Sequence, residues 1–173
     1  MNNEGGMQSN LDIFPLLAEE SYLRAHPEDR PCRAFLELCR EGDVVAIVGL
    51  LKNCSEPEDE DDEARGPWKS ADEVLRYQDP LGEMQSALHA AISSSQREVA
   101  WLLLLLASEL PELEFPALVY QEAGHLEIMR TDQSGKTDIR SLRDARGRTA
   151  EQIAAEMGGV WHGWVGNGRL ALQ

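Results

Sequence analysis

The chain is poor in basic residues and has no long hydrophobic run. Its 173 residues include 16 Lys and Arg against 31 Asp and Glu, which gives a formal net charge of −15. A nucleic-acid-binding protein usually carries a basic footprint, so this balance argues against direct nucleic-acid binding and favours a basic protein as a charged partner. The longest apolar run, Ala100 to Ala107, falls far short of the ~20 residues that span a bilayer. We therefore expect no membrane segment.

Cysteine is also scarce. Cys32, Cys39 and Cys54 form an odd set without a Cys-x-x-Cys pair, so neither a disulfide framework nor a zinc site is indicated. The N-terminus lacks the positive flank and apolar stretch of a secretory signal. We expect reduced cysteines that act as small core residues, in a protein of the cytoplasm, the nucleus or both.

Signatures of catalysis are missing as well. The four histidines, His26, His89, His125 and His162, have no partners at metal-ligand spacing, and there is no Gly-x-Ser-x-Gly elbow. The glycines near 163 to 168 stand in the wrong order for a dinucleotide-binding loop. We assign no catalytic residue, no cofactor and no metal ligand, and an enzyme is the least favoured class.

What is present is a repeat-like segment at Ser86 to Leu104, SALHAAISSSQREVAWLLL. A Ser-Ala-Leu-His box opens a first helix, Ser93 to Gln96 supplies a turn, and a leucine-rich second helix follows. This pattern resembles the ankyrin repeat, in which the Thr-Pro-Leu-His box is family-specific. In such a repeat the histidine of the box bonds neighbouring turns, so the resemblance gives His89 a structural role. Such a unit cannot bury its own apolar faces, so it implies neighbouring repeats.

Three further segments resemble parts of the same repeat. They are RAFLELCREGDVVAIVGLL at Arg33 to Leu51, EAGHLEIM at Glu122 to Met129, and DARGRTA at Asp144 to Ala150, which leads to Gly158. The expected helix-to-helix turns are Gly42, Ser95, Gly124 and Gly158. Two of the three intervals between them lie near the family period of about 33 residues. The first interval is longer, so we predict an insertion after the first repeat.

The insertion, residues 54 to 69, contains the acidic run Glu56-Pro57-Glu58-Asp59-Glu60-Asp61-Asp62-Glu63. Such a run cannot form a packed core, so we expect a disordered loop. It lacks the ligand spacing and glycine of a calcium loop. Two interpretations stay open: a solvated loop, or a docking element for a Lys/Arg-rich partner. The basic residues between Lys136 and Arg148 could also attract it as a weak latch.

The predicted fold is an all-α ankyrin-repeat solenoid of stacked helix pairs with hairpin-like turns and the acidic loop. Residues 1 to 30 form an extension with a capping helix near Leu11 to Tyr22. Residues 31 to 173 form the repeat domain, with repeats at about 31–53, 79–108, 112–132 and 142–165. Between Met129 and Asp144 we expect a shortened helix and a long finger, or a β-hairpin at Ser134-Gly135. At the C-terminus Trp161 and Trp164 should cover the open end, and a ligand-contact role is the alternative.

The resemblance implies a monomeric, non-catalytic protein-binding module, an intracellular adaptor or regulator that binds through the concave face and turn tips. The alternative is an acidic escort or chaperone for a basic client, such as a histone or ribosomal protein. For the module, the implied contact residues are Arg40, Glu41, Ser93, Ser94, Glu122, Ala123, Ala145, Arg146, Arg148, Glu156 and Met157. For the escort, the docking residues are Glu58, Asp59, Glu60, Asp61, Asp62 and Glu63.

Overall fold

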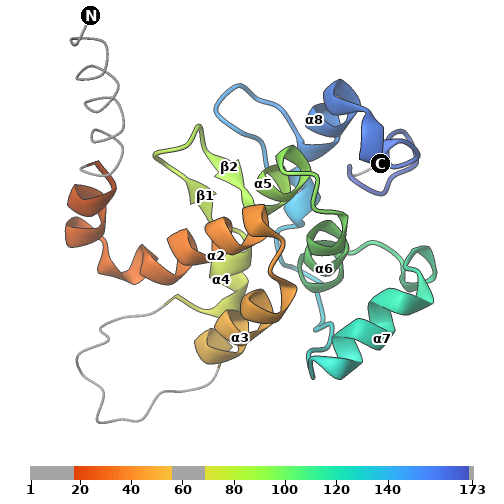
Figure 1. Ribbon diagram of the computed structural model, residues 1–173, viewed down its shortest axis with the longest axis horizontal. Helices are drawn as coiled ribbons and strands as arrows, with labels where there is room; N and C mark the ends of the chain where they lie inside the picture. The colour runs from red at the N-terminus through yellow and green to blue at the C-terminus, as the bar shows by residue number, and fades with distance from the viewer. Residues whose placement is uncertain (1–17, 56–68, 172–173) are drawn as a thin grey trace, which may run out of the picture.

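A computed structural model describes residues 18–55 and 69–171, and this part of the chain is mostly helical (Figure 1). The expected helical class is confirmed. The α-helices are α2 (Arg30–Glu41), α3 (Val44–Ser55), α4 (Ala71–Leu75), α5 (Ala87–Ser93), α6 (Arg97–Ala107), α7 (Ala117–His125) and α8 (Ala150–Met157), and residues 18–25 are also helical. The 3-10 helices are η1 (Pro27–Asp29), η3 (Glu112–Glu114), η4 (Ile139–Ser141) and η5 (Gly159–Trp161). Two short antiparallel strands, β1 (Gln78–Asp79) and β2 (Gln85–Ser86), form a hairpin.

The helix of residues 18–25 is held against α2 by polar contacts. Glu19 pairs with Arg33 at 2.6 Å between Oε2 and Nη2, and the Tyr22 hydroxyl donates to Asp29. The capping helix predicted near Leu11 to Tyr22 is therefore helical in its described portion. Residues 1–17 lie outside the described chain.

The first helix pair, α2 and α3, is joined at Gly42 as predicted. Buried residues recur along one face of α2 at Cys32, Phe35 and Cys39, which is helical spacing. Gly42 then adopts φ +80° and its N–H donates to the carbonyl of Leu38 at 2.9 Å. This left-handed residue ends the helix in the way that glycine favours.

Substitution of Gly42 by alanine should lower the free energy of unfolding by about 1–2 kcal/mol, because L-residues resist positive φ. A Cβ there would also collide with Oε1 of Gln96 and displace the Gln96 amide from the carbonyl of Arg40. Gly124→Ala is the matched control. Gly124 is helical with open space around it, so alanine there should raise stability by up to about 1 kcal/mol. Urea unfolding measures the change in the free energy of unfolding for each variant. If Gly42→Ala and Gly124→Ala both stabilised or both destabilised the protein, the left-handed turn at Gly42 and the helical position of Gly124 would be contradicted.

The second helix pair, α5 and α6, begins at a double cap. The Ser86 hydroxyl accepts from the N–H of His89, and the His89 ring accepts from the N–H of Ser86. Ser95, where the repeat resemblance places the turn, has φ +58°. The predicted turn is confirmed, and the three serines at 93 to 95 close α5 through backbone contacts.

Helix α5 lies between α2 and α8, and α2 and α8 flank it in Figure 1. At the N-terminal ends, Arg33 of α2 pairs with Asp79 of β1, the strand paired with β2 at the start of α5, and Nε2 of His89 lies 2.8 Å from the carbonyl of Arg148 just before α8. At the other ends, Gln96 after α5 donates to the carbonyl of Arg40 at 2.9 Å. The Trp161 indole after α8 donates to the carbonyl of Ile92 at 2.9 Å. The three helices therefore run side by side in the same direction.

Small residues allow these helices to approach. Ala87, Ala90 and Ala91 of α5 are almost fully buried, so no large side chain separates the neighbouring helix axes. On the other side of this stack, α6 packs against α3 and α7. Every residue from Leu102 to Ala107 is buried. Helix α6 is thus the apolar centre of the fold.

The expectations for residues 112–132 are partly wrong. A helix pair with its turn at Gly124 is predicted there, but the structure has one helix, α7, and Gly124 lies inside it. The left-handed residue is Glu127, with φ +57°. Residues 128–138 form neither the shortened helix nor the β-hairpin, although a turn does occur at Ser134-Gly135. This stretch is rich in Thr, Asp, Ser and Gly, which favour local turns over helix. As a result, α8 packs directly on α5, and α7 covers α6.

The C-terminal segment has no α-helix within residues 158–171, as its glycines predict. Trp161 is fully buried and Trp164 is nearly so. Their rings meet edge to face at 5.0 Å, and Trp164 lies 4.5 Å from the Trp101 ring of α6. The two tryptophans cover the end of the stack, as expected.

Candidate functional site

His89, in the middle helix of the stack, has both ring nitrogens in hydrogen bonds to the backbone. Nδ1 of His89 accepts from the N–H of Ser86 at 3.1 Å, so the ring proton sits on Nε2 and is donated to the carbonyl of Arg148 at 2.8 Å. Burial lowers the pKa of His89 below its ordinary 6.5, and the carbonyl of Arg148 offsets this only in part. Because of these contacts, the His89 imidazole is neutral and links α5 to the segment before α8.

The stability of the protein should fall as pH drops below about 6.5, and His89 is the cause. Because its folded-state pKa is lowered, the unfolded chain binds the proton first, so the His89 contribution is complete above pH 6.5 and is lost as pH falls towards the folded-state pKa. The carboxyl groups with lowered pKa, Asp132, Asp138 and Asp144, affect stability only below their ordinary pKa of 3.8. Urea unfolding at about pH 7.5 and 5.5 should therefore show a smaller gap between wild type and His89→Ala at the lower pH. An equal difference in the free energy of unfolding at the two pH values would contradict a lowered pKa for His89.

Cys32 and Cys39 do not form a reactive site. Cys32 and Cys39 are free and fully buried in the core, as expected. Burial raises the pKa of Cys32 to about 12, and the pKa of Cys39 is raised too, so neither is a thiolate near neutral pH. Within residues 18–55 and 69–171, no three His, Cys, Asp or Glu side chains are arranged to hold a metal ion.

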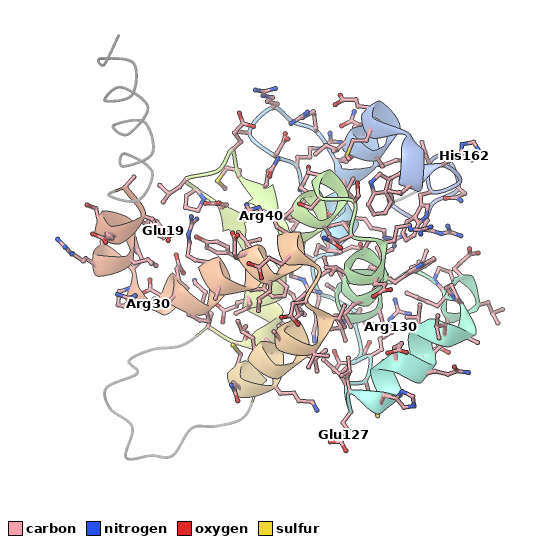
Figure 2. The ribbon with its side chains drawn as sticks, viewed as in Figure 1. Glu19, Arg30, Arg40, Glu127, Arg130 and His162 are labelled. Carbon is pink, nitrogen blue, oxygen red and sulfur yellow. The ribbon has the colours of Figure 1, made fainter. Side chains whose placement is uncertain are left out.

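Six of the predicted contact residues are brought into one row, the helix-end row. They lie at the aligned C-terminal ends of α2, α5 and α8: Arg40, Glu41, Ser93, Ser94, Glu156 and Met157. Glu41, Ser93, Glu156 and Met157 are exposed, and Ser94 is half-buried. Arg40 is half-buried beside Glu37, to which it bonds at 3.3 Å, and Figure 2 marks its position on α2. The row mixes charges of both signs with hydroxyl groups and one thioether.

Glu122 and Ala123 do not join this row, because they lie on α7. The expected exposure of Ala123 is wrong, since its side chain is buried beneath α7. Glu122 is exposed. The error follows from the misplaced turn at Gly124, which would have put both residues at a helix end.

The last predicted turn, with Ala145, Arg146 and Arg148, forms a finger next to the β1–β2 hairpin. The N–H of Ala145 donates to the carbonyl of Glu83 at 2.7 Å, and Arg146 pairs with the Glu83 carboxylate at 3.2 Å. Arg148 is half-buried and pairs with Asp144 at 3.0 Å. Ala145 and Arg146 are exposed at the finger tip, while Arg148 serves mainly to hold the finger.

The predicted docking run, Glu58, Asp59, Glu60, Asp61, Asp62 and Glu63, lies outside the described residues. The basic stretch that could attract it is described, and most of its charges already have acidic partners. Lys136 pairs with Asp72 at 2.9 Å and Arg140 pairs with Asp138 at 2.8 Å. These ion pairs argue against a latch between the two segments.

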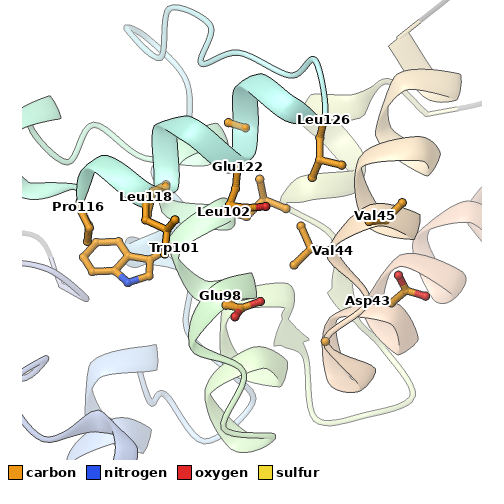
Figure 3. A pocket seen from close by; sticks show the side chains of 13 residues that line it. Asp43, Val44, Val45, Glu98, Trp101, Leu102, Pro116, Leu118, Glu122 and Leu126 are labelled. Carbon is orange, nitrogen blue, oxygen red and sulfur yellow. The ribbon is translucent and has the colours of Figure 1, made fainter.

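A groove that the sequence did not reveal lies between α3, α6 and α7, and its volume is about 500 Å³ (Figure 3). Apolar side chains line it: Val44 and Val45 from α3, Trp101 and Leu102 from α6, and Leu118, Val119 and Leu126 from α7, with Pro116 at one end. Three carboxylates, Asp43, Glu98 and Glu122, complete the lining. Glu122 is therefore a predicted contact residue found at a different site from the one expected.

Contacts before and after α7 support its position beside this groove. Arg130 lies between α6 and α7 (Figure 2), and its guanidinium stacks on the Phe115 ring at 5.1 Å and donates to the carbonyl of Ser108. At the far end Glu127 lies 3.9 Å from Lys52 of α3. The groove is thus a built feature of three helices.

Comparison of the chain with protein-family models, curated proteins and solved structures finds no match. Among the helices that the structure describes, none has both the length and the apolar character needed to cross a bilayer.

Proposed function

We propose that the chain is a non-catalytic protein-binding module of the ankyrin-repeat kind, with three stacked units rather than four. The observation that carries this proposal is the row of first helices, α2, α5 and α8, tied together at both ends by hydrogen bonds. The units would be α2 with α3, α5 with α6, and α8 with the tryptophan-rich C-terminal segment. Helix α7 would belong to an insertion between the second and third units.

In this proposal the helix-end row and the finger tips bind the partner, and the protein acts as an intracellular adaptor or regulator. Ser93 and Glu156 offer exposed hydroxyl and carboxylate groups, and Met157 offers an adaptable apolar contact. Adjacent units of a stack present such residues as one continuous surface. Recognition through a surface of this kind needs no catalytic group, cofactor or metal.

The second candidate function is an acidic escort for a basic client, with residues 58–63 as the docking element. It is favoured by the ion pairs of the basic stretch, because Lys136, Arg140, Arg146 and Arg148 pair with acidic residues of the described chain, two of which, Asp138 and Asp144, lie within the stretch itself. The net charge of −15 then remains available to a basic client.

An affinity pull-down with the intact chain tests the module. The double variant Ser93→Arg/Met157→Arg should reduce partner retention about tenfold or more, since 1.4 kcal/mol of lost binding free energy suffices for that. Glu20→Lys is the control, because it changes the net charge equally at an exposed residue far from the row. Retention that is the same for both variants would contradict the row as the binding surface.

Salt and charge neutralisation separate the two functions. The escort function requires that binding weakens steeply with added salt, because salt screens exposed charges more than about 8 Å apart. It also requires that binding is lost when Glu58 to Glu63 are changed to Gln and Asn, which removes the docking charges. The module requires that binding survives both changes. Circular dichroism on each variant checks that the fold is retained.

A further inference from the structure

The groove between α3, α6 and α7 is distinct from the helix-end row. It lies on the side of the fold formed by the second helices of each pair, and α7 forms one wall (Figure 3). Leu118 lies beside Trp101 on one side, and Val44 and Val45 belong to α3 on the other. None of these residues belongs to the helix-end row or to the finger tip that are proposed to bind the partner.

Apolar side chains at this groove are exposed on two facing helices. Val45 of α3 is 67% exposed and Leu118 of α7 is 63% exposed. Trp101, which also lines the groove, is half-buried. Exposed apolar groups arranged around a concave surface are typical of protein-binding sites, whereas single exposed apolar residues need no explanation.

The charge of the groove is negative. Asp43, Glu98 and Glu122 are all exposed, and no Lys, Arg or His stands among the described residues that line the groove. Such a surface attracts cations and repels acidic segments. The acidic run of this chain is therefore a poor occupant, and so is a second copy of a chain with a net charge of −15.

We propose that this groove docks an amphipathic helix from a partner protein, with its apolar face on Trp101 and Leu118 and its Lys or Arg side chains beside Glu98 and Glu122. A helix in an apolar groove is a recurrent mode of recognition, in which apolar residues three and four positions apart anchor the ligand. The flanking carboxylates select a basic helix through charge complementarity. This inference does not depend on the helix-end row, so either can fail without the other.

The test uses the intact chain and a fluorescein-labelled peptide of about 14 residues, two copies of LKKLLKL, which has the pattern of an amphipathic helix. Fluorescence anisotropy measures its Kd. Wild type should bind this peptide at least about tenfold more tightly than the same peptide with Ser in place of Leu or with Glu in place of Lys. Equal binding of the Ser peptide would show attraction by charge alone and overturn the proposal.

Variants locate the binding. Val45→Ser/Leu118→Ser should weaken the peptide about tenfold, whereas Leu113→Ser, an almost fully exposed leucine outside the groove, should leave Kd unchanged. Glu98→Gln/Glu122→Gln should weaken binding more than Glu20→Gln/Glu109→Gln, which removes equal charge at exposed residues that do not line the groove. Unchanged Kd in both groove variants would place the peptide elsewhere and overturn the proposal.

Sedimentation velocity excludes the competing occupant. A wild-type dimer that becomes monomeric in the Val45→Ser/Leu118→Ser variant would show that a second copy fills the groove, which overturns the proposal. A wild-type monomer that binds the peptide with one-to-one stoichiometry supports it.

Discussion

Replacement of Trp161 by alanine should lower the free energy of unfolding by about 3–5 kcal/mol, the range for truncation of a large buried aromatic side chain. The Trp161 side chain is fully buried, meets Trp164 edge to face, and donates its indole N–H to the carbonyl of Ile92 at 2.9 Å. Alanine would leave a cavity between α5 and the segment after α8 and would remove one donor from the carbonyl of Ile92, which also accepts from the N–H of Ser95. Chemical denaturation followed by circular dichroism measures the loss.

Val160→Ala is the control for this experiment. Val160 precedes Trp161 in the same turn but is 41% exposed, so its truncation should cost less than about 1 kcal/mol. If Trp161→Ala were as mild as Val160→Ala, the indole would not cover the end of the stack in solution.

The second large effect is expected for His89→Ala, with a loss of about 2–4 kcal/mol at pH 7.5. The change removes the ring that completes the cap at Ser86, so the buried N–H of Ser86 loses the Nδ1 acceptor, and the carbonyl of Arg148 keeps only the donor from Asp144. A lost cap costs about 1 kcal/mol, and a buried donor left without its partner costs about 1–3 kcal/mol. His162→Ala, at an exposed position, should change stability by less than about 0.5 kcal/mol.

Amide hydrogen exchange tests separately whether His89 stabilises the finger before α8. If the ring stabilises the finger, amide protons of Arg146 and Arg148, which donate to Asp144 at 2.9 Å, should exchange faster in the His89→Ala variant. Unchanged exchange there would mean that the ring supports α5 alone.

Local signals explain why much of the stack could be predicted from the sequence. Gly42 and Ser95 both adopt positive φ where the repeat pattern places its turns, because short-range backbone geometry restricts which residues can end a helix. The Ser-x-x-Glu spacing at Ser70 and Glu73 is likewise a local signal, and the two residues form the capping box that starts α4. These features depend on neighbours only three or four residues away.

The region around α7 could not be predicted in the same way. The Gly-His-Leu-Glu-Ile segment matches the family pattern in its letters, yet Gly124 is helical and Glu127 takes the positive φ. A glycine permits a turn without requiring one. Helix α7 extends to His125 while Ala123 packs inwards, so tertiary packing rather than local sequence sets its end.

The groove could not be predicted from the sequence, because it too depends on tertiary packing. Val45 and Leu118 are more than 70 positions apart in the sequence, and only the packing of α3, α6 and α7 brings them to one surface. The available signal was weak. Val45 lies off the buried face of α3 that Ile47, Val48 and Leu51 form, which marks it as an apolar residue without a place in the core.

The proposed binding surface depends most on the direct packing of α8 against α5. Nitrogen-15 NMR of the intact protein tests this packing at His89. Above pH 6.5 we expect a neutral ring with its proton on Nε2, protected from exchange, and nuclear Overhauser contacts from that proton to Arg148 and Thr149. A ring that exchanges freely and shows no contact with residues 148 and 149 would contradict the stack and, with it, the proposed binding surface.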